Sequence, residues 1–194
     1  MRTYLLVAHN TRKGKGDELD SSHLRIRVPR IFTAADGLTV ADLLHFGFDH
    51  TASAKVLIER NARHYDSAGY LAHLGIECLL KAWHLHAFEK YQGVHGLEVL
   101  WNGLRANAEV HQLSTKDLKT LHVLDNYAEL RYPTLNSPLE IGSDDWPNMS
   151  ALERALLRRM PKALKEVIAG LHWSKKGGRV LMEKPIARRQ NAGN

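Results

Sequence analysis

The most continuous hydrophobic pattern in the sequence runs from residue 66 to residue 86 and reads DSAGYLAHLGIECLLKAWHLH. Its apolar positions cover almost the whole circumference of a helix, which predicts a buried helix rather than a surface one. His73, Glu77 and Lys81 nevertheless follow one another at intervals of four residues. Side chains with this spacing lie in one row along a helix. The sequence therefore predicts a polar row on a helix that otherwise belongs to a core.

Two interpretations of this polar row stay open. Glu77 and Lys81 have the spacing and order of an exposed ion pair, which stabilises a helix by ~0.2–0.5 kcal/mol. Alternatively, the row lines a cleft or a dimer interface. Burying charges without partners is strongly unfavourable, so a buried row would be expected to have a function.

Four further helical patterns cover about residues 39–60, 97–104, 114–133 and 150–172. Thr39 with Asp42, and Ser150 with Glu153, have the spacing of capping boxes, so we expect the first and last helices to begin there. The long helix is expected to end near residues 91–93, and Pro161 is expected to kink the last helix. A loop rich in Ser, Pro, Asp and Gly is expected over about 134–149.

About five helices with short connections predict an all-α fold, an up-and-down helical bundle over residues 39–173. The segments TYLLVA and HLRIRVP near the start have strand character. Residues 1–38 are therefore expected to form a basic arm, with a short β-hairpin as one form of it. Residues 174–194 are expected to form a basic, flexible tail.

The net charge of +6 is concentrated at the two ends of the chain. Residues 1–30 hold seven Arg and Lys against three acids, and residues 173–194 hold six against one. The segment between them is mildly acidic. Basic ends favour an anionic partner such as RNA, although solvated tails that aid solubility are an equal alternative.

The apolar run YLLVA is too short for a signal peptide or a membrane span, and Cys78 has no second cysteine to pair with. These features predict a cytoplasmic protein with no membrane association. The sequence holds twelve His residues but no His-x3-His or His-Glu-x2-His motif, so we expect no metal site. We also expect no cofactor, because a phosphate-binding loop is not recognisable.

Four segments occur in an order that resembles the HEPN domain, a helical-bundle family linked to RNA and nucleotides. They are SAGYLAHLGIECLLKA, HGLEVL from His95, YAELRYP from Tyr127, and the last helical pattern at 150–172. The resemblance spans about residues 39–172 and leaves out the basic arm and the tail.

This resemblance implies a homodimer with an RNA- or nucleotide-related function. Many members are metal-independent ribonucleases with an Arg-x4–6-His motif, in which the Arg stabilises developing phosphate charge and the His moves a proton. Arg131 stands at the place of the motif Arg. The positions for the His hold Asn136, Ser137 and Pro138 instead. Elsewhere, Arg2–His9 and Arg105–His111 match the spacing but lie in the wrong part of the chain.

The resemblance therefore favours an RNA- or nucleotide-binding protein whose nuclease activity is lost. Two alternatives are a metal-independent ribonuclease of the toxin or defence type, and a helical partner of a separately encoded nucleotidyltransferase. The catalytic candidates are Arg131 and His95. The binding candidates are Glu77, Lys81, Arg131, Tyr132, Lys175 and Lys176. We expect Glu77, Lys81 and Arg131 to meet in one polar groove, and whether His95 joins them stays open.

Overall fold

The computed structural model describes residues 29–60, 64–107, 110–131 and 145–171. Its elements, in chain order, are β1 (Ile31–Thr33), the 3-10 helix η2 (Ala34–Asp36), α1 (Val40–Arg60), α2 (Tyr65–Phe88), β2 (Lys90–Gln92), α3 (Leu97–Asn107), α4 (Thr115–Asp125), the 3-10 helix η4 (Asn126–Arg131), α5 (Asp145–Arg159) and α6 (Lys162–Ala169). The predicted all-α bundle is confirmed. The described part of the chain adds a two-stranded sheet to it.

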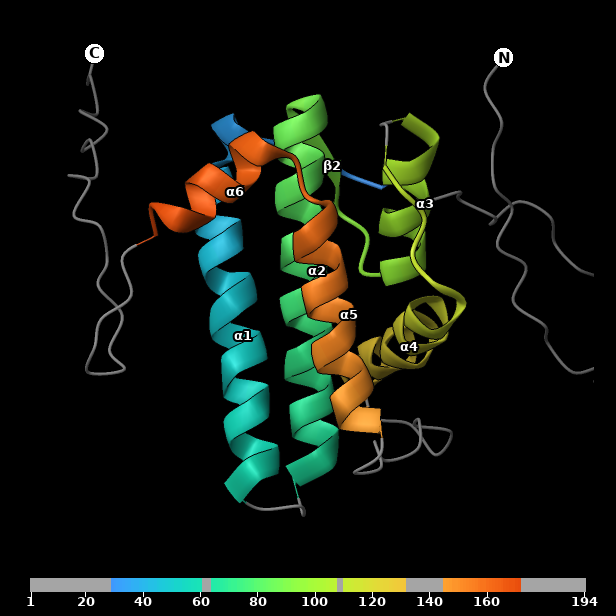
Figure 1. Cartoon of the computed structure of the whole chain (residues 1–194). Coiled ribbons are helices and arrows are strands. Elements are labelled where there is room, and N and C mark those ends of the chain that lie inside the picture. Colours follow the sequence, from blue (N-terminus) through green and yellow to red (C-terminus); the bar gives the residue numbers. More distant parts are fainter. Residues whose placement is uncertain (1–28, 61–63, 108–109, 132–144, 172–194) are drawn as a thin grey trace, which may run out of the picture.

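Helices α1 and α2 are the two long helices of the bundle and run side by side in opposite directions (Figure 1). Two glycines let their backbones approach closely. A Cβ on Gly75 would lie 2.5 Å from Thr51 Cγ2 and 2.9 Å from the carbonyl oxygen of Gly47. A Cβ on Gly47 would lie 2.8 Å from Leu79 Cδ2. Glycine in these helices therefore serves the packing of α1 against α2.

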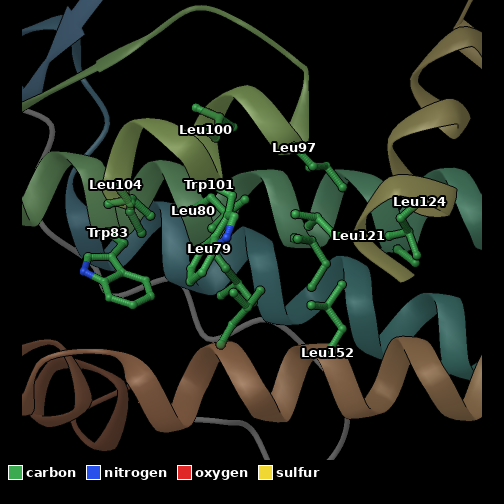
Figure 2. Close-up of a cluster of buried hydrophobic side chains, with 14 of the residues drawn as sticks. Leu79, Leu80, Trp83, Leu97, Leu100, Trp101, Leu104, Leu121, Leu124 and Leu152 are labelled. Atoms are coloured by element: carbon green, nitrogen blue, oxygen red, sulfur yellow. The ribbon is translucent and has the colours of Figure 1, made fainter. Parts of the chain in front are cut away.

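Helix α2 lies at the centre of the fold, between α1 on one side and α3 and α4 on the other (Figure 1). Trp83 of α2 and Trp101 of α3 meet edge to face, with ring centroids 6.3 Å apart. Leu152 of α5 points toward the same buried cluster (Figure 2). Figure 2 labels ten of its members: Leu79, Leu80, Trp83, Leu97, Leu100, Trp101, Leu104, Leu121, Leu124 and Leu152. The apolar pattern of the long helix is thus explained by its neighbours on several sides.

The predicted start of the first helix is confirmed. The backbone N–H of Asp42 donates to Thr39 Oγ1 at 3.2 Å, and the backbone N–H of Thr39 donates to Asp42 Oδ2 at 2.9 Å. These are the two reciprocal bonds of a capping box. Ser114 likewise accepts from the backbone N–H of Asp117 at the start of α4. Local capping signals were sufficient at these two helices.

The predicted end of the long helix was wrong. Helix α2 ends at Phe88, because Glu89 adopts a left-handed conformation with φ of 57°. The chain then forms β2, which pairs antiparallel with β1 in a register that places Phe32 opposite Tyr91. Their rings stack with centroids 5.3 Å apart. Strand β1 lies at the end of the predicted arm, while the hairpin expected earlier in it, and the predicted tail, fall outside the described residues.

The predicted start of the last long helix was also wrong. Helix α5 begins at Asp145, so Ser150 and Glu153 lie inside it and do not cap it. Glu153 is buried instead, and it accepts hydrogen bonds from Thr51 Oγ1 at 3.0 Å and Lys55 Nζ at 3.2 Å. A tertiary contact with α1 therefore explains this acid.

Pro161 ends a helix rather than kinking one. Helix α5 stops at Arg159, and Pro161 stands at the N-cap of the separate helix α6, which crosses one end of α1 (Figure 1). The break is consistent with the missing N–H and ring clash of proline inside a helix. Within the described residues, no helix has the length and apolar character needed to cross a membrane.

Candidate functional site at Glu77

The polar row of α2 is buried. His73, Glu77 and Lys81 are each less than a tenth exposed, so the interpretation of Glu77 and Lys81 as a surface pair is wrong. The row faces the neighbours of α2 on the side of α3, α4 and β2. His73 contacts α4, Glu77 contacts the segment that precedes α3, and Lys81 contacts β2.

Glu77 is the centre of this group, and three nitrogen atoms surround its carboxylate. Lys81 Nζ donates to Oε1 at 2.5 Å, and His95 Nδ1 donates to the same oxygen at 3.0 Å. His73 Nε2 lies 3.4 Å from Oε2. We refer to Glu77, Lys81, His95 and His73 as the Glu77 cluster. His95 comes from the segment before α3, so the cluster ties that segment to the middle of α2.

His73 has a defined orientation within the cluster. Its Nδ1 lies 3.1 Å from the carbonyl oxygen of Leu124, near the end of α4. Because a carbonyl oxygen only accepts, Nδ1 carries a proton, and the other ring nitrogen points at Glu77. The Nε2–Oε2 distance is long for a hydrogen bond, and Nε2 has no hydrogen-bond partner among the described atoms.

The surroundings of Glu77 hold it in the charged form. Burial by itself raises the pKa of the carboxyl group, but the adjacent ring of His73, the ammonium of Lys81 and the ring of His95 outweigh this effect. Together they lower the pKa of Glu77 to about 2 from its ordinary value of 4.5. The carboxylate is therefore ionised at neutral pH, in a place where an unpaired charge would be strongly unfavourable.

The cluster continues to the small sheet. Lys81 Nζ lies 5.7 Å from the ring centroid of Tyr91, a cation–π distance. Tyr91 stacks in turn on Phe32 of β1. Lys81 is thus held between a carboxylate and an aromatic face, and both contacts commit its charge to the interior of the protein.

His95 is the member of the cluster that solvent can reach, with 47% of its side chain exposed, against 6% for Glu77. A carboxylate that accepts from Nδ1 fixes the orientation of the ring. The arrangement can therefore present one oriented imidazole at the surface. It does not suit a cation, because the ammonium of Lys81 already contacts the carboxylate, and among the described residues no three His, Cys, Asp or Glu side chains are placed so that they could hold a metal ion.

A comparison with protein-family models matched the HEPN domain over residues 40–170. The chain belongs to the HEPN domain family. Comparisons with curated proteins and with solved structures gave no match. At the family level, membership supports an RNA- or nucleotide-related function.

This HEPN domain brings together three of the residues that its sequence singled out, since Lys81 and His95 both contact Glu77. Arg131 is the last residue of η4, which packs against α2. The side chain of Arg131 lies outside the described part of the structure, as do Tyr132, Lys175 and Lys176. Their predicted roles stay predictions.

Two contributors to the Glu77 cluster were not among the predicted site residues. His73 had a usable signal, because it stands one helical turn before Glu77, but a lone His at this spacing is also common in surface pairs. Tyr91 had no signal, because it was assigned to the end of a helix. Only the turn at Glu89 and the pairing of β2 with β1 bring the Tyr91 ring under Lys81.

Proposed function

We propose that this HEPN domain binds RNA or a nucleotide at the surface next to the Glu77 cluster and does not cleave it. The observation that carries the proposal is the exposed imidazole of His95, which a buried carboxylate holds in one orientation. Glu77 and Lys81 support this group from the interior rather than touching the ligand. Buried ion pairs are often no more stabilising than apolar side chains of the same size. Their retention in this core is explained if they hold the ring of His95 in place.

The absence of cleavage follows from the motif positions after Arg131. Metal-independent cleavage of RNA requires a group that moves protons and a group that stabilises the developing charge on phosphate. In this chain the positions where the family motif has its His hold Asn136, Ser137 and Pro138. Binding needs only an anion-contacting surface, and the basic residues of the predicted tail, Lys175 and Lys176 among them, would add to it.

RNA binding tests the proposal directly. The fluorescence anisotropy of a labelled single-stranded RNA should rise with protein, and the affinity should fall as salt is raised. His95→Ala should weaken binding by about fivefold or more, since a lost charge-assisted contact is worth ~1–2 kcal/mol. His122→Ala is a matched control, because His122 also contacts a glutamate, Glu98, at 2.9 Å, but on an exposed part of α4. Equal affinities of the wild type and His95→Ala would remove His95 from the site.

Deleting residues 174–194 tests the tail separately. If the tail supplies part of the binding, the deletion should reduce both the affinity and its dependence on salt. Loss of all binding on deletion, with no effect of His95→Ala, would place the RNA contacts in the tail and away from the Glu77 cluster.

A metal-independent ribonuclease is the second candidate, and the contact between Glu77 and His95 favours it. A ring that donates from Nδ1 to a carboxylate has the arrangement of a general base, with Nε2 as the acting nitrogen. In that case His95 would replace the missing motif His, and Arg131 would stabilise the phosphate. Incubation of a structured RNA with the protein and a metal chelator is the assay. Cleavage that both His95→Ala and Arg131→Ala abolish would establish this function and refute ours.

We also propose that the protein is a homodimer, and a nucleotidyltransferase partner is the alternative to RNA binding. Light scattering after size-exclusion chromatography should give twice the chain mass for the homodimer. A protein that binds no RNA but co-purifies stoichiometrically with a nucleotidyltransferase would instead be an interaction module.

A further inference from the structure

A second site lies outside the Glu77 cluster, in a cavity of about 490 Å³ between the end of α2, strand β2 and helix α3. This volume is within the range of pockets that hold small organic ligands. Its apolar lining includes Ile31, Phe88 and Val99. Its polar lining includes His84, Lys90 and Gln92.

The inner part of the cavity is rigidly built. His84 is buried, and its Nε2 donates to the carbonyl oxygen of Leu100 at 2.8 Å. Its ring packs edge to face against Phe88, with centroids 5.5 Å apart. A Cβ on Gly103 would lie 3.0 Å from His84 Cε1, so the glycine gives the ring its place beside α3. Burial lowers the pKa of His84, which keeps the ring neutral and leaves the inner part of the cavity uncharged.

The mouth of the cavity is apolar and exposed. Ile31 is 48% exposed and Val99 is 47% exposed. In the part of the chain that the structure describes, four large apolar residues are exposed, and these two border the same cavity. Exposed apolar side chains that gather around a concavity are typical of binding sites rather than of ordinary surface.

One charge accompanies this apolar mouth. Lys90 lines the cavity from β2, and no other charged side chain does so among the described residues. A pocket with an apolar part and a single cation is complementary to a molecule with an apolar body and one acidic group. We propose that the cavity binds a small amphipathic anion, with its body between Ile31, Phe88 and Val99 and its acidic group at Lys90.

This site is independent of RNA binding at His95. Tyr91 lines the cavity, but the charge of Lys81 near its ring is already committed to Glu77. Lys90 therefore supplies the charge in the described lining of the cavity, and His95 is not among the lining residues. The two proposals can succeed or fail separately.

Anilinonaphthalene sulfonate is a suitable probe, since it combines aromatic rings with one acidic group and becomes fluorescent in apolar surroundings. The full-length folded protein should bind it at one saturable site. Val99→Trp should fill the mouth and abolish this binding, while Val56→Trp, a control on α1 with 46% exposure at Val56, should not. Lys90→Gln should weaken binding about fivefold or more, whereas Lys119→Gln on α4 should leave it unchanged. Circular dichroism should show that each variant is folded.

Competition identifies the body of the ligand. Displacement of the probe by adenosine monophosphate would assign a nucleotide-like ligand, and displacement by decanoate would assign an aliphatic acid. Either result supports the proposal. Failure of both competitors, or equal effects of Val99→Trp and Val56→Trp on the probe, would overturn it. Equal effects of Lys90→Gln and Lys119→Gln would overturn the role of Lys90 as the anion contact.

Discussion

Replacing Glu77 with glutamine is the sharpest test of the Glu77 cluster. The substitution keeps the size of the side chain and one carbonyl oxygen but removes the negative charge. Lys81 would then remain buried, with an amide in place of the carboxylate that it contacts at 2.5 Å. His95 would lose the charged acceptor of its Nδ1 proton. The fold should persist, because the apolar contacts of α2 are unchanged.

The magnitude of the effect follows from the pKa of Glu77. Its decrease from 4.5 to about 2 means that the native state stabilises the carboxylate relative to its protonated form. At ~1.4 kcal/mol per pKa unit, this preference corresponds to roughly 3 kcal/mol. Breaking a buried ion pair by removing one partner typically costs about 3–5 kcal/mol. We therefore expect Glu77→Gln to lower the free energy of unfolding at neutral pH by about 3 kcal/mol.

Urea denaturation followed by circular dichroism measures this change. Glu98→Gln is the control, because Glu98 and its partner His122 are both exposed, and such pairs contribute little, about 0–1 kcal/mol. The double variant Glu77→Gln/Lys81→Met should be more stable than Glu77→Gln alone, since it no longer buries an unpaired ammonium. If Glu77→Gln lowers the free energy of unfolding by under ~1 kcal/mol, or if the double variant is no more stable than Glu77→Gln, Glu77 and Lys81 do not form a stabilising buried ion pair.

Three further predictions follow from the described contacts. Gly75→Ala should destabilise the protein by about 1–3 kcal/mol and lower its melting temperature, because the new Cβ would lie 2.5 Å from Thr51 Cγ2. In the control Gly170→Ala, the new Cβ would have its nearest contact at 3.5 Å, so the melting temperature should change little. The folded-state pKa of Glu77 is depressed, so the contribution of its carboxylate to stability should be complete above pH 4.5 and lost as the pH falls toward about 2. The difference in unfolding free energy between the wild type and Glu77→Gln should therefore shrink over that pH range. A difference that stays constant would contradict this prediction. Asp125→Ala should lower the free energy of unfolding, measured by urea denaturation, by about 1–2 kcal/mol. The reason is that Asp125, although it belongs to α4, caps the start of α3 by accepting from the backbone N–H of Leu97 at 2.6 Å. Asp125→Asn keeps an acceptor oxygen and should lower the free energy of unfolding less.

The fold class and most helices could be predicted because they depend on nearby residues. The spacing of apolar side chains predicts a helical face, and Thr39 with Asp42 forms its capping box within one turn. The same local signal was misleading at Ser150 and Glu153. There, the carboxylate forms hydrogen bonds with Thr51 and Lys55 of α1, about a hundred residues earlier, so its role depends on the fold and not on its own segment.

The Glu77 cluster shows the same division. The spacing of Glu77 and Lys81 alone placed them in contact, since one helical turn brings their side chains together. Their burial, the approach of His95 and the position of Tyr91 were decided only by the tertiary structure, because each depends on how α3 and β2 pack against α2. A surface pair and a buried charged site have the same spacing in the sequence. They differ in the neighbours that exclude water, and those neighbours come from distant parts of the chain.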